Sequence, residues 1–134
     1  MILPLPITLA TASILTLLGL VVAMRAAMAR GKHGILMGDG GNPDMIARMR
    51  THANFVEYVP LLLILMGLLE LAGANRIALI AGGALLFVVR VLHAVGMGLA
   101  QPNPWRAAGT VGTTLLTLFF AGYGLVMGIS TLGA

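Results

Sequence analysis

The fold is decided by residues 54–100, NFVEYVPLLLILMGLLELAGANRIALIAGGALLFVVRVLHAVGMGLA. Two long apolar runs, 54–72 and 77–100, are separated here by a few residues. Each run is near the roughly 20 residues that a helix needs to cross the hydrocarbon of a bilayer. Extended strands with unpaired backbone groups cannot cross it. The stretch therefore predicts an antiparallel hairpin of two transmembrane helices.

Two further apolar runs, 2–24 and 107–132, flank this hairpin. Asn42 followed by Pro43 has the pattern of a helix N-cap and first position, and Asn103-Pro104 repeats it. No basic residue precedes the first run, which disfavours a cleaved signal peptide. We predict an all-α integral membrane protein, a four-transmembrane-helix bundle in a single domain, 1–134, with helices over about 2–29, 43–72, 77–100 and 104–132.

The composition supports a membrane protein. Of the 134 residues, 59% are hydrophobic and 9% charged, where soluble domains average about 25% charged. A soluble chain this short could not bury so much apolar surface, whereas a lipid bilayer accepts it. The net charge of +4 could suggest nucleic acid, but the basic residues lie between the apolar runs, which is typical of membrane topology. With no cysteine, a disulfide and a thiolate metal site are excluded, and we expect no metal site and no nucleic-acid partner.

The basic residues also predict orientation. The loop between the first two runs holds five of them, the loop before the last run holds Arg106, and the middle loop holds only Arg76. The positive-inside rule places the first and third loops in the cytoplasm and both termini outside. His33 in the first loop is expected to be solvated.

Polar residues interrupt the two central helices. Arg50, Asn54 and Glu57 lie at i, i+4 and i+7, so they share one helical face, and Tyr58 lies at its edge. Arg90 and its neighbour His93, at i and i+3, share a face of the next helix.

An antiparallel hairpin puts Glu57 level with Arg90. Charges at membrane depth cost at least about 2.5 kcal/mol each, so they are usually paired inside the protein. The spacing leaves open whether partners meet within one subunit or across a subunit boundary, and whether the pair only fixes packing. Asn54 is level with His93 in the same way. Glu70 and Arg76 are expected to form an ion pair at the outer surface.

The segment Arg50-Thr-His-Ala-Asn54-Phe-Val-Glu57-Tyr58-Val-Pro60 resembles the second-helix signature of the MAPEG family, the membrane-associated proteins of eicosanoid and glutathione metabolism. Arg90 falls where the family has a third-helix arginine. The resemblance spans nearly the whole chain, four helices and an outside N-terminus included.

The resemblance implies a homotrimer with active sites at the subunit boundaries near the cytoplasmic face. It implies glutathione as co-substrate, an apolar small-molecule acceptor, and activity as a transferase or peroxidase on apolar electrophiles. A bacterial-type member would lie in the inner membrane. Arg106 falls near the arginine that stabilises the glutathione thiolate. By position, the residues implied to bind glutathione are Arg30, Arg50, Asn54, Glu57, Tyr58, Arg90 and His93.

The chemistry of these residue types agrees. Glutathione carries two carboxylates, which suit arginines, and one ammonium, which suits Glu57. A free thiol has a pKa of about 8.5, so a cation is needed to ionise it at neutral pH. Arg106 would lie in the first turn of the last helix, where its charge adds to the positive end of the helix dipole.

The sequence leaves two alternatives to a glutathione-dependent enzyme. The chain has His93 and Met97 where well-studied members carry tyrosines, so it could be a binding or scaffold protein that keeps the family fold without chemistry. A small four-helix multidrug transporter has similar size and hydropathy. It needs an acid in its first helix, and residues 2–24 contain none.

Overall fold

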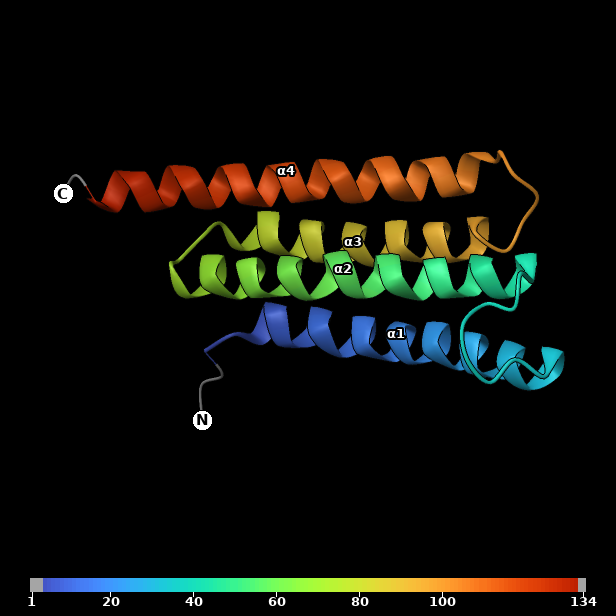
Figure 1. Cartoon of the computed structure of the whole chain (residues 1–134). Helices are drawn as coiled ribbons and strands as arrows, with labels where there is room; N and C mark the ends of the chain where they lie inside the picture. The colour runs from blue at the N-terminus through green and yellow to red at the C-terminus, as the bar shows by residue number, and fades with distance from the viewer. Residues whose placement is uncertain (1–3, 133–134) are drawn as a thin grey trace.

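A computed structural model describes residues 4–132, which form a bundle of four helices and no strand over that range (Figure 1). All four helices are long and apolar enough to cross a membrane, which confirms the predicted all-α membrane fold. The predicted start of the first helix, near residue 2, lies outside the described residues. The helices are α1 (Pro6–His33), α2 (Pro43–Leu71), α3 (Arg76–Gly96) and α4 (Pro104–Leu132).

Helix ends follow local chemistry. Asn42 caps α2 by accepting from the Met45 N–H at 3.1 Å, and Asn103 accepts from the Arg106 N–H at 2.9 Å. Both caps were predicted, because asparagine before proline satisfies the free N–H groups of a first turn. At the other end of α1, Gly34 adopts a left-handed φ of 66° and closes the helix at His33, one turn later than predicted.

The bundle has two ends of different character. Loop one (residues 34–42) and loop three (97–103) lie together at one end, and loop two (72–75) lies at the other (Figure 1). Along the bundle α2 packs chiefly on α1, and α3 packs chiefly on α4. A Cβ at Gly96 or Gly109 would overlap backbone of the facing helix, so α3 and α4 approach each other backbone to backbone near loop three.

Glu70 lies at the loop-two end and joins α2 to α1. Its carboxylate accepts the backbone N–H groups of Ile7 at 2.9 Å and Thr8 at 2.7 Å. The predicted ion pair between Glu70 and Arg76 is therefore wrong. The first N–H groups of α1 have no partner within the helix, and no side chain on the N-cap Leu5 satisfies them. A carboxylate suits them through hydrogen bonds and the helix dipole.

Candidate functional site

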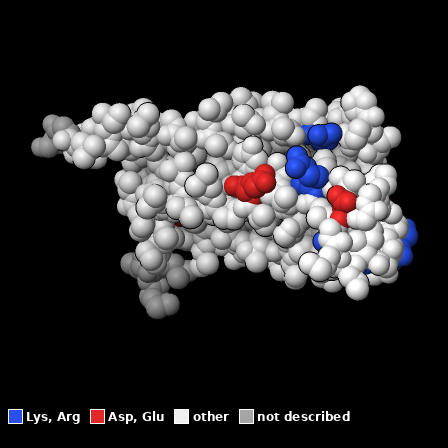
Figure 2. All heavy atoms as spheres, viewed as in Figure 1, with Lys and Arg blue, Asp and Glu red and all other residues white. Residues whose placement is uncertain are grey.

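The polar row of α2 lies on the outside of the bundle. Arg50 and Glu57 are exposed, Tyr58 is 37% exposed and Asn54 is half-buried. Within the part of the chain that is described, none of these four side chains has a hydrogen bond or ion pair to another side chain. Charged side chains of both signs gather on this face, over the half of the bundle that ends in loops one and three (Figure 2). The row is thus a polar surface without a partner in its own chain.

The depth of this row makes it unusual. Glu57 falls inside the apolar run that begins at Asn54, and the large apolar side chains that follow on α2, Leu61 and Ile64, are 64% and 62% exposed. An ionised carboxylate facing lipid at this depth is costly. Within residues 4–132 no Lys, Arg or His side chain forms an ion pair with Glu57.

Arg90 of α3 is buried, with 1% of its surface exposed. Its guanidinium carbon lies 5.5 Å from the centre of the Phe55 ring, and Nη1 donates to the Thr113 hydroxyl at 3.4 Å. The predicted pair of Arg90 with Glu57 is therefore not formed within the chain. The predicted level is nearly right, but Phe55 and Glu57 are two residues apart and so point about 200° apart on the helix.

His93, one turn from Arg90, is also buried, with 4% exposed. It lies against α4, where Gly109 leaves room for its backbone and Cβ. The predicted pairing with Asn54 is not formed either. Arg90 Nε and His93 Nδ1 have no hydrogen-bond partner among the described residues, and each such buried group costs roughly 1–3 kcal/mol. These two residues and the exposed row of α2 are not brought together on one surface of the single chain.

Arg106 lies in the first turn of α4, as predicted, and its side chain is exposed. Its Nη1 donates to the Gln101 side-chain oxygen at 3.2 Å. This single neutral bond leaves most of the donors of the Arg106 guanidinium free for an anion.

Arg30 of α1 is held by loop one. Its Nη1 donates to the Gly38 carbonyl at 2.9 Å, and Nη2 lies 3.7 Å from the Met49 sulfur. Arg30 therefore connects α1 to the loop that follows it and to α2.

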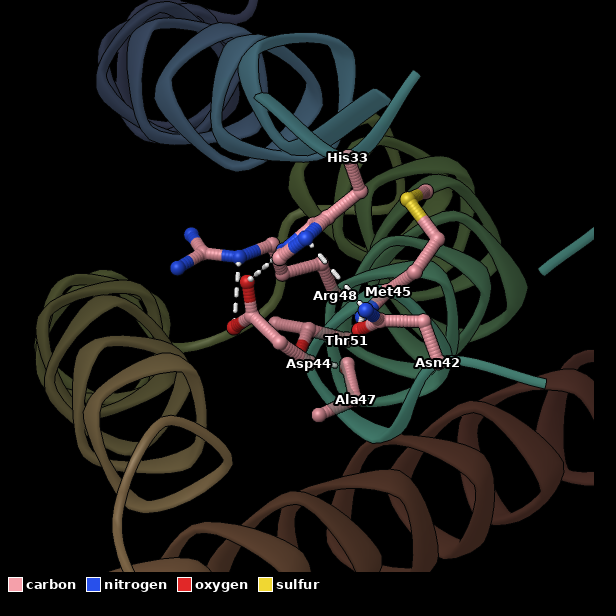
Figure 3. Close-up of polar contacts among 7 residues, drawn as sticks. All are labelled: His33, Asn42, Asp44, Met45, Ala47, Arg48 and Thr51. Carbon is pink, nitrogen blue, oxygen red and sulfur yellow. Dashed lines mark hydrogen bonds and ion pairs between the residues drawn. The ribbon is translucent and has the colours of Figure 1, made fainter. Parts of the chain in front are cut away.

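Sequence reasoning missed a cluster at the loop-one end (Figure 3). The Asp44 carboxylate accepts from His33 Nε2 at 3.0 Å and from Arg48 Nε at 2.9 Å, and Asn42 Nδ2 lies 3.3 Å from His33 Nδ1. His33 is thus half-buried at the end of α1, so its predicted place in a solvated loop is wrong. Asp44 and Arg48, at i and i+4, were the visible signal.

This cluster borders a small cavity between α1, α2 and α3. Its volume is about 20 Å³, which accommodates roughly one water molecule. Arg25, Thr51 and Met97 are in its wall. The cluster joins helix ends and offers no space for a substrate. No group of three or more His, Asp or Glu side chains that could hold a metal ion occurs in residues 4–132.

The helices and the row define a class, a four-helix integral membrane protein with charged residues on one transmembrane helix that no side chain of residues 4–132 pairs. The family model of the MAPEG family matches residues 8–126. The chain therefore belongs to the MAPEG family.

Two curated relatives are similar to this chain. Both are called inner membrane protein YecN, one from Escherichia coli strain K12 and one from Escherichia coli O6:H1 strain CFT073. Each is 31% identical over 84 residues, which cover 63% of this chain and 63% of the relative. The match thus spans less than two thirds of the relatives' length. No solved structure matches the chain.

Proposed function

We propose that this protein is a glutathione-dependent transferase or peroxidase of a bacterial inner membrane. It works as a homotrimer on apolar electrophiles, with glutathione bound at the subunit boundaries near the cytoplasmic face. The observation that carries the proposal is the row of exposed Arg50, half-buried Asn54 and exposed Glu57, in which no described side chain pairs either charge and Glu57 lies at membrane depth.

A subunit boundary explains why the row is bare in one chain. A second copy packed on α2 would remove the row from lipid, and glutathione between the copies would supply the missing charges. The Arg50 guanidinium suits a carboxylate as a two-donor fork, and Glu57 suits the α-ammonium. Asn54 and Tyr58 add neutral hydrogen-bond partners beside these charges.

Arg106 is the residue that we assign to the thiol. Its free donors and the N-terminus of α4 both favour an anion, so the thiol would lose its proton to solvent and bind as a thiolate. The thiolate sulfur then attacks an electrophilic carbon of the acceptor, and a carbon–sulfur bond forms as the leaving group departs. Neither step requires Arg90 or His93 to touch glutathione; their burial suits a role in holding α2 against α3 and α4.

The orientation is part of the proposal. The end of the bundle that holds loops one and three carries six of the eight basic residues. They are Arg25, Arg30 and Lys32 in the second half of α1, Arg48 and Arg50 near the start of α2, and Arg106 in the first turn of α4. The positive-inside rule then places this end in the cytoplasm, where reduced thiols are available.

The test is ultraviolet detection of the glutathione thiolate on mixing glutathione with purified protein in detergent. We expect a thiolate signal in the wild type and its loss in Arg106→Ala. Arg76→Ala is the matched control, because Arg76 is an exposed arginine in the first turn of α3, at the opposite end of the bundle. A wild type without signal, or an equal signal in Arg106→Ala, would contradict the proposal.

A non-catalytic binding or scaffold protein is the second candidate. His93 and Met97 favour it, because the resemblance expects tyrosines at these positions. Neither residue presents a hydrogen-bond donor to a ligand on the surface. His93 is buried, and Met97, which lines the small cavity, has no N–H or O–H group in its side chain. This candidate predicts glutathione binding without thiolate and without turnover of any electrophile in a broad panel. Turnover of one electrophile would remove it.

A further inference from the structure

Loop one carries an apolar tip that the proposed function does not use. Ile35, Leu36 and Met37 follow one another, and the Leu36 and Met37 side chains are 93% and 88% exposed. Adjacent large apolar side chains this bare mark an interaction surface rather than ordinary scatter. We define these three residues as the loop-one tip.

The tip belongs to a loop with a defined shape. The Asp39 carboxylate accepts the Gly41 N–H at 2.8 Å, and the Asp39 carbonyl accepts the Asn42 N–H at 3.0 Å. Gly38 and Gly41 have left-handed φ angles of 68°, which favour glycine. The turn that follows the tip is therefore held in a defined conformation by its own hydrogen bonds and glycines.

The loop turns back along the bundle. In Figure 1 it leaves α1, runs alongside the last turns of that helix and then enters α2. The Arg30 guanidinium binds the Gly38 carbonyl, so the residue after the tip returns to the level of Arg30, one helical turn before the end of α1.

That level is the edge of a membrane. The apolar run of α1 ends at Met24, and the exposed Arg25 follows it. Arg30 lies six residues after Met24, about 9 Å along the helix. The polar layer on each side of the hydrocarbon is roughly 5–8 Å thick. Gly38, which binds Arg30, thus lies near the outer edge of the headgroup layer, and the tip precedes it directly.

The surrounding charge suits lipid phosphates. Lys32, in the last turn of α1, is exposed, and Arg25, about two turns earlier on the same helix, is exposed as well. Apolar side chains flanked by basic ones are typical of segments that lie in the headgroup region of a bilayer containing anionic lipids.

We propose that the loop-one tip is an interfacial anchor, with Leu36 and Met37 inserted among the lipids of the leaflet on the loop-one side. Because Gly38 binds Arg30, the anchored loop also holds Arg30 in place. The proposal rests on the membrane embedding of the helices and makes no use of glutathione, so failure of the thiolate test leaves it standing.

Spin labels test the anchor directly. The chain has no cysteine, so Leu36→Cys, Met37→Cys and, as control, Pro43→Cys can each carry a single nitroxide. Pro43 is exposed at the start of α2, outside the apolar runs. The labelled protein is reconstituted in vesicles of phosphatidylethanolamine and phosphatidylglycerol. Collisions with oxygen, which prefers lipid, and with a water-soluble nickel chelate are then measured.

We expect the oxygen-to-nickel collision ratio at 36 and 37 to be several-fold higher than at 43. A ratio at 36 and 37 equal to that at 43, with ready access of nickel, would show the tip in water and overturn the proposal. Exclusion of both reagents from 36 and 37 would show protein, such as a second copy, covering the tip, and would overturn it equally.

Discussion

The polar row of α2 and the polar pair of α3 lie near the same level of the bundle in opposite surroundings. Glu57 is exposed and has no side-chain partner among residues 4–132, whereas Arg90 is buried between the Phe55 ring and the Thr113 hydroxyl. Both are charged residues in transmembrane helices, and the sequence alone does not distinguish their surroundings. Burial therefore distinguishes the two charges: Glu57 is accessible from outside the bundle, and Arg90 contacts side chains of α2 and α4.

The largest effect on stability is expected at Arg90. Arg90→Ala should lower the free energy of unfolding by about 3 kcal/mol, because a large buried side chain and its contact with Phe55 are lost. Arg90→Met keeps volume and removes the unpaired Nε, so it should cost within about 1 kcal/mol. Unfolding in mixed micelles measures both variants. If Arg90→Ala unfolded like the wild type, Arg90 would not be a structural residue.

A substitution at the exposed Arg106 is expected to lower activity and leave stability unchanged. Arg106→Ala should slow conjugation of an electrophile roughly 100-fold, the size of effect seen when one donor to a developing anion is removed. The midpoint of unfolding should not change, because the Arg106 side chain is exposed and bonds only to Gln101. Initial rates and thermal unfolding of the same preparations give both readouts. A parallel loss of stability would assign Arg106 to the fold instead.

The two glutamates of α2, Glu57 and Glu70, are expected to differ in their contribution to stability, by a smaller amount. Glu70→Ala should destabilise the protein by about 1 kcal/mol, because the Ile7 and Thr8 N–H groups at the start of α1 lose their acceptor. Glu57→Ala should leave stability in detergent unchanged or raise it slightly, since no bond within the chain is broken. Equal losses for the two variants would contradict this assignment.

Much of this architecture could be predicted from the sequence. The lengths of the apolar runs predict four transmembrane helices, and the capping residues Asn42 and Asn103 predict where two of these helices begin. Spacing also gives the level of Arg90 along the membrane. It does not give the rotation of α2 about its axis, so Phe55 rather than Glu57 meets Arg90. The sequence also does not show that the Glu70 carboxylate accepts the free N–H groups at the start of α1. Every helix has such groups, and no residue pattern indicates which distant side chain will accept them.

The smallest effect is expected at the cluster of the loop-one end. Asp44→Ala removes the acceptor of both His33 and Arg48, so amide exchange in loop one and the last turn of α1 should quicken several-fold. The rest of the bundle should exchange as in the wild type, because the Asp44 side chain is half-exposed and contacts only helix ends. Unchanged exchange in loop one would show that the cluster does not order it.

We propose above all that the row on α2 binds glutathione. Calorimetric titration of glutathione into the purified wild type, Glu57→Gln and Arg50→Ala tests it most directly, with Glu70→Gln as a control on the same helix. We expect binding to the wild type and to Glu70→Gln. We expect the affinity of each row variant to be at least about tenfold lower, because a charge-assisted bond is lost. Equal affinity in all four proteins, or no binding to the wild type, would contradict it.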